Sequence, residues 1–340
     1  MKNVATLADV SFKTVSRVVN GEPGVSRQLE ERVTAAIAEL GYQPDHGARN
    51  LRRTTPQSAT VGVIHANISN PFMAAVHGAF EAVAAAHGCL ILSGTSLEQA
   101  ERHDELIQAF TGRRVDGLLI VPVGAPTDRP SELLEREIKR GTPVVFIDRD
   151  PGFPADVVMS DHRGGAQLAT QHLLNHGHHK IAFLGSREHV HSVVERRAGF
   201  EAVMRGAAAN RAVADRAAVI TDLRTPDDAA KAVHELMSLS PGQRPTAIFS
   251  AQNGLTLGAV RALHTLGLQH DIALVGFDHI DSADIVDPGI TTVPQNAKEV
   301  GQRAGELLFS RLAGDLAGPV REIVPVTLVR RGSGEIPAPT

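Results

Sequence analysis

The sequence is poor in cysteine and in aromatic residues. Its 340 residues contain one cysteine, no tryptophan, one tyrosine and 11 phenylalanines. A single cysteine excludes an intrachain disulfide, and the run Gly-Cys-Leu-Ile-Leu around Cys89 predicts a buried strand rather than a reactive thiol. No apolar run approaches the ~20 residues of a membrane-spanning helix, and the N-terminus lacks the apolar stretch of a signal peptide. These absences favour a cytoplasmic protein without a membrane partner.

The length and the charge distribution indicate more than one domain. A chain of 340 residues predicts two or three domains. The net charge of -4 argues against a protein coated with positive charge. Residues 1–58 nevertheless carry eight Lys or Arg against six Asp or Glu, so a weakly basic N-terminal part precedes an acidic body. Although the difference is small, it suits an N-terminal module that binds nucleic acid.

Residues 10–20, Val-Ser-Phe-Lys-Thr-Val-Ser-Arg-Val-Val-Asn, predict a short amphipathic helix. At helical spacing the apolar side holds Val15, Val18 and Val19, and the polar side holds Lys13, Ser16, Arg17 and Asn20. Ser11 is placed to cap the first turn, and Asn20 to end the helix before Gly21. Because so short a helix is not stable alone, its valines need neighbouring helices to cover them.

Two such neighbours are predicted. Upstream, Val4, Ala5, Leu7 and Ala8 form an apolar helix face that ends at a tight link through Asp9. Downstream, Ser26 begins a helix whose apolar residues recur every three to four positions up to Gly41. Two short helices with a tight turn and a third that braces them form a helix-turn-helix, which offers its second helix to a DNA major groove. On helical period alone, the solvated face of a small helical bundle is an equally good interpretation.

Further motifs in this region match one known family. Residues 21–26 read Gly-Glu-Pro-Gly-Val-Ser, residues 32–44 read Arg-Val-x-x-Ala-Ile-x-Glu-Leu-Gly-Tyr-x-Pro, and Ala48 and Leu51 follow. With residues 10–20 they closely resemble the headpiece of the lactose-repressor/galactose-repressor family of bacterial transcription regulators, and the resemblance continues to the region of residue 331. It implies a sequence-specific DNA-binding regulator, expected to be a repressor and not an enzyme, whose operator affinity a small-molecule effector controls.

The resemblance also implies roles for residues of the predicted headpiece, residues 1–43. Phe12 and Lys13 would distinguish between operators, and Arg17 would contact base edges or phosphates. The residues expected to hold the DNA backbone in register are Ser11, Thr14, Ser16 and Asn20. Chemistry agrees, because Lys and Arg donate to guanine and Phe can contact a thymine methyl group. Asp9 stands where the family commonly has Gly, so we expect a left-handed turn with some strain there.

Residues 44–58 are predicted to link the headpiece to the body. Pro44 can begin a short helix, and three arginines cluster in its far half. In the family this segment is a hinge helix that orders on operator DNA and inserts a leucine into the minor groove. Leu51 takes that place and Ala48 lies one turn earlier, so the operator would have to kink. By composition alone, a basic flexible linker is also possible.

From Thr60 onward, short apolar strands alternate with longer helices, which predicts an α/β fold with parallel sheets covered on both faces. Strands are expected at 61–64, 89–92, 117–121, 144–147, 181–184, 217–220, 247–250 and 273–275. Helices are expected at 71–87, 98–112, 131–140, 162–176, 193–207, 226–238 and 253–266. These strand–helix units are too many for one sheet, so the sequence predicts two similar lobes.

The resemblance supplies the topology of this body, a two-lobed effector and dimerisation domain like a periplasmic binding protein, at residues 59–331. The chain is expected to cross between lobes near residues 161, 290 and 322. Lobe one would hold 59–160 and 291–321, lobe two would hold 162–289 and 323–331, and 332–340 would be a flexible tail.

Polar residues follow many of the predicted strands, where open α/β sheets bind ligands. The candidates for effector contacts, some at positions that the family uses, are Phe72, Asp148, Arg149, Asp161, Ser192, Arg196, Gln252, Asp278 and Gln295. Carboxylates and guanidinium groups suit a ligand with many hydroxyls, and Phe72 can stack on a sugar face. Individual candidates can instead be strand-end caps or ion pairs between the lobes.

One departure from the family concerns the effector. The family often has Ala-Asn-Asp where this chain has Ala251, Gln252 and Asn253, so an amide replaces a carboxylate. The effector is expected to be a sugar or a sugar derivative, and purines stay an alternative because some relatives bind them.

The histidines at 172, 176, 178 and 179 resemble a metal cluster, but no carboxylate or cysteine stands at ligand spacing, so packing and helix-end roles are expected. No Gly-x-Gly-x-x-Gly, Walker, Gly-x-Ser-x-Gly or His-Glu-x-x-His motif occurs, and no cofactor or metal is expected.

The C-terminal residues lack a leucine heptad, which favours a homodimer on a pseudo-palindromic double-stranded operator. Two other functions are compatible with an α/β body. A carbohydrate-binding protein without a regulatory DNA role has no use for residues 1–58, and a cytosolic α/β enzyme would need a nucleophile or base in a recognisable setting.

Overall fold

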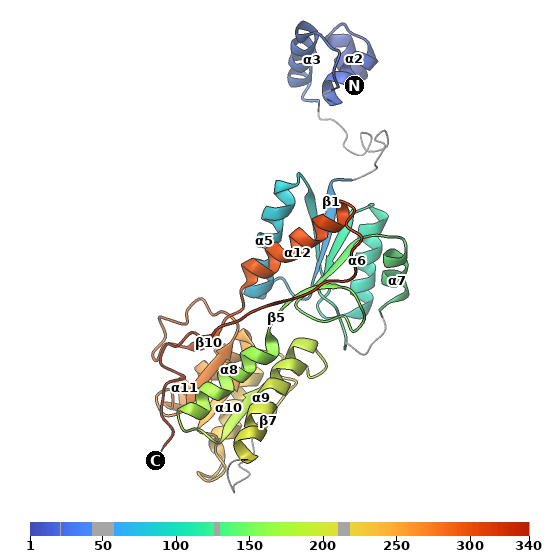
Figure 1. Ribbon diagram of the computed structural model, residues 1–340. Coiled ribbons are helices and arrows are strands. Elements are labelled where there is room, and N and C mark those ends of the chain that lie inside the picture. The colour runs from blue at the N-terminus through green and yellow to red at the C-terminus, as the bar shows by residue number, and fades with distance from the viewer. Residues whose placement is uncertain (21, 43–57, 126–129, 210–217, 340) are drawn as a thin grey trace. The chain divides into compact units, whose positions relative to one another are not determined.

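The computed structural model describes residues 1–20, 22–42, 58–125, 130–209 and 218–339. The chain forms two compact units, Met1–Ala59 and Thr60–Thr340 (Figure 1). Ala48 and Leu51, which are expected to reach the minor groove, lie outside the described residues, as does almost all of the predicted linker at 44–58.

The first unit contains helices α1 (Lys2–Leu7), α2 (Phe12–Asn20) and α3 (Arg27–Glu39), which confirms the predicted helix-turn-helix. Its small core is formed by Val4, Ala8, Val15, Val33 and Ala36. The turn between α1 and α2 contains Asp9 at a φ of 47°, the left-handed conformation expected where relatives have Gly. The Arg32 guanidinium donates to the Ala8 carbonyl oxygen at 2.7 Å, so α3 braces this turn.

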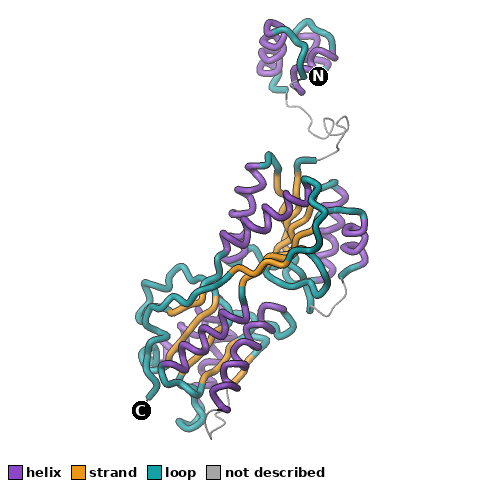
Figure 2. The backbone as a smooth tube through the Cα atoms, in the orientation of Figure 1, coloured by secondary structure: helices purple, strands orange, loops and turns teal. Residues whose placement is uncertain are grey.

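The second unit contains two parallel sheets, each covered by helices on both faces (Figure 2). The first sheet has the order β11-β5-β4-β3-β1-β2. Its strands are β1 (Thr60–His65), β2 (Leu90–Thr95), β3 (Gly117–Ile120), β4 (Val144–Ile147), β5 (Asp156–Ser160) and β11 (Arg321–Val324). Helices α5 (Pro71–Ala86) and α12 (Ala297–Leu312) pack on one face, and α6 (Ala100–Gly112) and α7 (Glu132–Lys139) on the other. These elements form lobe one.

Lobe two is built around the second sheet, with the order β10-β9-β8-β6-β7. Its strands are β6 (Ile181–Leu184), β7 (Ala218–Ile220), β8 (Ala247–Ser250), β9 (Ala273–Phe277) and β10 (Thr291–Val293). Helices α8 (His162–Asn175) and α9 (His191–Ala209) cover one face, and α10 (Pro226–Ser238) and α11 (Asn253–Leu266) the other. The strand order repeats that of lobe one, so each lobe has an equivalent sheet edge where its strands end.

The crossings between the lobes differ slightly from the prediction. The first falls after Ser160, as expected near 161. Strand β10 (291–293) pairs with β9 in lobe two, so the second crossing follows Val293 rather than residue 290. Strand β11 pairs with β5 up to Val324, so the third crossing follows residue 324 rather than 322. Strands β5, β10 and β11 and helix α12 were not predicted, because they are short or lie in segments assigned only through the resemblance.

The expected flexible tail at 332–340 is wrong for its described residues, 332–339. The Ser333 hydroxyl donates to the Leu274 carbonyl oxygen at 2.6 Å, and Glu335 accepts from the Thr291 hydroxyl at 2.7 Å. The Ala338 amide donates to the His176 carbonyl oxygen at 3.0 Å. This segment therefore fastens the chain end to lobe two, which residue composition alone did not reveal.

Cys89 also differs from expectation. It precedes β2 and is only half-buried, because β2 is the edge strand of its sheet and has no fully covered face. Partial burial raises the pKa of its thiol, and no reactive setting results.

Candidate functional site

Helix α2 presents a polar face on the first unit. The Ser11 hydroxyl oxygen accepts from the Thr14 amide at 3.1 Å and so satisfies an amide of the first turn, which confirms the predicted cap. Val15 is fully buried, whereas Phe12 is 43% exposed and Lys13 is exposed. The opposite sides of one helix therefore hold the core and a free face of the size that enters a major groove.

The charge pair of Arg17 and Glu22 on this face is weak. Nε of Arg17 lies 3.9 Å from a carboxylate oxygen of Glu22, and both side chains are about half exposed. Exposed pairs at this distance contribute little stability, so Arg17 can exchange Glu22 for a base edge or a phosphate. Thr14 and Ser16 are partly exposed beside it. The side chain of Asn20 lies outside the described residues.

The second unit contains a cavity of about 720 Å³ whose lining comes from both lobes. It lies beyond the carboxyl ends of β1, β4, β6, β8 and β9, where parallel sheets bind ligands. The predicted effector residues that line it are Phe72, Asp148, Arg149, Ser192, Arg196, Gln252, Asp278 and Gln295. All but one of the sequence-predicted candidates are thus brought together.

Asp161 is the exception. It is not among the residues that line the cavity, and its carboxylate accepts from the Gly164 amide at 2.8 Å. Asp161 is therefore the N-cap of α8. The expectation of an effector contact is corrected accordingly, because the carboxylate is engaged in closing the first turn of a helix.

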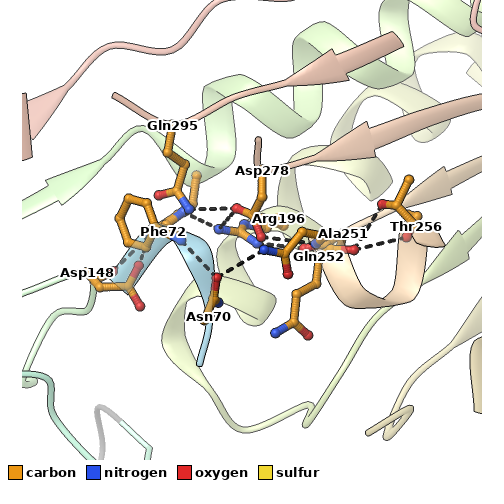
Figure 3. A network of polar contacts seen from close by, with 12 residues as sticks. Asn70, Phe72, Asp148, Arg196, Ala251, Gln252, Thr256, Asp278 and Gln295 are labelled. Atoms are coloured by element: carbon orange, nitrogen blue, oxygen red, sulfur yellow. Dashed lines mark hydrogen bonds and ion pairs between the residues drawn. The ribbon is translucent and has the colours of Figure 1, made fainter. Parts of the chain in front are cut away.

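Arg196 and Asp278 form the centre of the polar lining (Figure 3). The Arg196 guanidinium, on α9, donates to the Ala251 carbonyl oxygen at 2.6 Å and to Asp278 at 3.4 Å. It also lies over the Phe277 ring, with its carbon 3.8 Å from the centroid. The Asp278 carboxylate accepts from the Gln295 side-chain amide at 2.6 Å and from the Asn253 backbone amide at 3.2 Å. Both charges are therefore held in fixed positions before any ligand contact.

The equivalent turn of lobe one carries a second charged group. Asp148 follows β4 as Asp278 follows β9, and both have left-handed backbones, with φ values of 68° and 76°. Beside Asp148, the Arg149 guanidinium donates to both carboxylate oxygens of Glu98, at 2.7 and 2.8 Å. Burial raises the pKa of Asp148, and the Arg149 guanidinium only partly offsets this effect. The salt-bridge partner Arg149 holds the pKa of Glu98 below its ordinary value against the opposing effect of burial.

Comparisons with known proteins agree with both surfaces. Residues 1–45 match the family model "Bacterial regulatory proteins, lacI family", and residues 170–334 match the model of a periplasmic binding protein-like domain. The ribose operon repressor of Halalkalibacterium halodurans is 31% identical over 97% of this chain and 96% of its own length.

The chain belongs to the lacI family. Two solved structures of relatives resemble it over nearly the whole length. A lac repressor dimer bound to operator and the anti-inducer ONPF has a TM-score of 0.84 and 26% identity, and covers 97% of each chain. A complex of the transcriptional regulator CelR with cellobiose has a TM-score of 0.70 and 30% identity, and covers 98% of each chain. This lacI-family chain is therefore a DNA-binding transcriptional regulator with a small-molecule effector domain, and not an enzyme.

Among the described residues of this lacI-family protein, two side chains donate hydrogen bonds directly from lobe two to lobe one. The Asn253 side-chain amide of lobe two donates to the side-chain oxygen of Asn70 in lobe one at 3.0 Å. His162, on the first turn of α8, donates from Nε2 to the Asp148 carbonyl oxygen at 2.8 Å and accepts at Nδ1 from Arg196 at 3.2 Å. Burial, and next the Arg196 guanidinium, lower the pKa of His162 well below its ordinary 6.5, so the ring is neutral.

Sequence analysis missed two residues of this network. Glu98 follows β2, but that strand was predicted to end at 92, whereas it ends at Thr95. With the correct end, the rule that found the other candidates would have included Glu98. Leu97 and Glu98 both have left-handed backbones, with φ values of 54° and 61°, which direct the chain back toward Arg149. His162 gave no signal, because an isolated histidine next to a helix cap has no recognisable pattern.

The histidines near the end of α8 have the packing and helix-end roles that were predicted. His178 donates from Nε2 to the Ile336 carbonyl oxygen at 2.8 Å, and His176 donates from Nδ1 to the His172 carbonyl oxygen at 2.9 Å. Among the described residues, no group of three His, Cys, Asp or Glu side chains is placed to hold a metal ion. In the same part of the chain, no helix is long and apolar enough to cross a lipid bilayer.

Proposed function

We propose that this chain acts in the cytoplasm as a homodimeric repressor that binds pseudo-palindromic operator DNA and responds to a sugar. The relatives support the parts of this proposal: a lac repressor dimer is bound to operator, and CelR is bound to cellobiose. The observation that carries the proposal is the fixed Arg196–Asp278 pair at the strand ends of lobe two, inside a cavity of about 720 Å³. A guanidinium and a carboxylate held side by side match the donor and acceptor pattern of adjacent hydroxyls.

On the DNA side, we propose that Phe12, Lys13 and Arg17 read base edges. The side chains proposed to hold the DNA backbone are Ser11, Thr14, Ser16 and Asn20. The exposed face of α2 and its buried opposite side support this assignment. Ala48 and Leu51 are proposed to reach the minor groove through the hinge, by the family resemblance alone.

On the effector side, the lining favours a sugar over a purine. The proposed contacts are Phe72, Asp148, Arg149, Ser192, Arg196, Gln252, Asp278 and Gln295. Phe72 contributes the only phenyl ring among the described residues that line the cavity, and it is 7% exposed. A purine would need a larger aromatic surface for stacking, whereas hydroxyl groups find abundant donors and acceptors.

The proposal is tested by a gel shift of the full-length protein on the duplex upstream of its gene, with random duplex as competitor and with D-ribose or cellobiose added. We expect specific retardation that one sugar changes about 5- to 150-fold in affinity. Sugar binding without any preference for the upstream duplex would support a carbohydrate-binding protein instead. No preference for any duplex and no binding of either sugar would contradict the proposal.

A further inference from the structure

His162 is the residue through which charged groups of both lobes meet. It is 2% exposed and lies at the first position of α8, directly after the first crossing between the lobes. Its two ring nitrogens have different partners, one in each lobe. Few residues have such a placement, because most of the polar side chains of the cavity bond within their own lobe.

The hydrogen bonds fix the state of the ring. A carbonyl oxygen can only accept, so the bond to Asp148 requires the proton on Nε2. A guanidinium can only donate, so the bond from Arg196 requires a bare Nδ1. One neutral tautomer therefore satisfies both neighbours at once, and neither a protonated ring nor the other tautomer does.

The two partners are themselves parts of the proposed effector site. The carbonyl oxygen belongs to Asp148, in the left-handed turn that also positions Arg149. The guanidinium belongs to Arg196, which also bonds Asp278 and Ala251. The ring of Phe277, 6.2 Å away between centroids, packs beside His162 and beneath Arg196. A shift of Arg196 toward or away from a ligand would therefore displace the Asp148 turn through one rigid ring.

We propose that His162 is a positioning residue that couples the two lobes: it transmits the position of the Arg196–Asp278 pair to the Asp148 turn without touching the effector itself. The claim that this coupling controls DNA affinity rests on the proposed function. The claim that His162 restrains the two lobes does not. The second direct link, from Asn253 to Asn70, joins the N-termini of α11 and α5 at another point of the cavity. Rotation of one lobe about that link is then restrained by His162.

Three substitutions of His162 distinguish a role in coupling the lobes from a role in filling space. In His162→Phe the ring shape stays and both bonds are lost. In His162→Asn the side-chain oxygen can still accept from Arg196, but the amide is too short to reach the Asp148 carbonyl oxygen. In His162→Gln the amide can reach that oxygen, but no acceptor stands at the position of Nδ1. If His162 couples the lobes, Phe and Asn lose the bond across them, whereas Gln keeps that bond and loses only the contact with Arg196. If His162 only fills space, Phe is the mildest change.

The primary measurement is the distance between spin labels on the two lobes of the full-length protein, without any added sugar. Labels replace the exposed Glu105 on α6 and Lys231 on α10, in a Cys89→Ser background diluted with unlabelled chain so that only distances within one subunit are read. We expect distance distributions about twofold broader in His162→Phe and His162→Asn than in the parent, and a distribution close to the parent's in His162→Gln, which keeps the bond across the lobes. Circular dichroism and thermal melting confirm that each variant is folded.

A distance distribution in His162→Phe as narrow as that of the parent would overturn the coupling role. So would distribution widths that increase across the three variants with the side-chain volume each one loses. If His162→Phe does not fold, the two polar variants still decide the question. A broadened Asn variant beside a parent-like Gln variant supports coupling, and equal widths in Asn and Gln contradict it. A second readout is the ratio of operator affinities with and without D-ribose or cellobiose, expected to fall toward one in all three. Absence of DNA binding or of a sugar response in the parent would refute the proposed function and leave the distance result intact.

Discussion

The polar face of α2 and the lining of the cavity are both rich in charged side chains, but their surroundings differ. On α2, the side chain of Arg17 is 43% exposed and lies 3.9 Å from an equally exposed carboxylate. In the cavity, Arg196 and Asp278 are 5% and 3% exposed, and each has several hydrogen-bond partners. The first set is held by one helix and the second by contacts among several elements of both lobes.

This difference in burial predicts which substitutions change binding without changing the stability of the fold. Side chains in water can be removed at little cost to the fold, because water replaces their lost partners. A buried ion that loses its partner keeps its desolvation cost, so the fold suffers when one member is removed. We therefore expect changes to exposed side chains of α2 that make no cap, such as Arg17, to affect DNA binding alone, and changes to buried charges of the cavity to affect ligand binding and folding together.

The largest expected effect is that of Arg196→Ala. It leaves the buried Asp278 carboxylate without its charged partner and opens a void over Phe277, at a cost of about 3–5 kcal/mol in the free energy of unfolding. Urea unfolding followed by circular dichroism measures it. The matched control is Arg261→Ala, which removes an exposed pair with Asp227 at 2.7 Å and should cost at most about 1 kcal/mol. If the two variants lost the same free energy of unfolding, buried and exposed charges would not differ in their contribution to stability.

Acid is expected to weaken the effector domain. Burial, and next the neighbouring His77, lower the pKa of His65 to about 4 from 6.5. Its folded pKa is depressed, so the unfolded chain binds the proton first and stability is lost as the pH falls from 6.5 toward 4, by at most about 3 kcal/mol. Unfolding curves at several pH values measure the slope. His65→Gln should flatten this slope, and an unchanged slope would assign it to other groups.

Arg17→Ala is expected to weaken specific DNA binding by about 1–3 kcal/mol and to leave the melting temperature unchanged. Fluorescence anisotropy with the upstream duplex measures the affinity. Arg113→Ala removes the same charge from the other unit and serves as the control, because Arg113 is an exposed arginine directly after α6. Equal losses in both variants would indicate non-specific attraction by net charge rather than reading of bases.

The smallest expected effect is that of Ser11→Ala. It removes the hydroxyl that accepts from the Thr14 amide and should destabilise the headpiece by ~1 kcal/mol. Ser11→Asp supplies another capping oxygen and should restore most of the loss. Hydrogen exchange of the α2 amides measures both variants, and equal exchange in wild type and Ser11→Ala would show that the cap does not hold the helix.

Much of this architecture follows from sequence periodicity. Helices such as α10 and α11 were predicted to the residue, because each has an apolar stripe and a marked end: Thr225 caps the start of α10, and the left-handed Gly267 ends α11. Strand β10 has only three residues and β11 is half-exposed, so neither has a pattern that distinguishes it from a loop. Most cavity residues follow from one rule, that polar residues stand beyond strand ends, whereas Arg196 and Ser192 on α9 follow from the family resemblance. Asp161 obeys the same rule and is a helix cap, which only the three-dimensional contacts reveal.

The most direct test of the separation between the two surfaces is one anisotropy experiment with two variants, Arg17→Ala and Asp278→Asn, titrated onto the upstream duplex with and without D-ribose or cellobiose. Arg17→Ala should bind the duplex more weakly, by about 1–3 kcal/mol, and keep its thermal stabilisation by the sugar, whereas Asp278→Asn should keep the duplex and lose the response to the sugar. If Asp278→Asn responds to the sugar as the wild type does, or if Arg17→Ala binds the duplex unchanged, the assignment of DNA reading to α2 and of effector control to the cavity is contradicted.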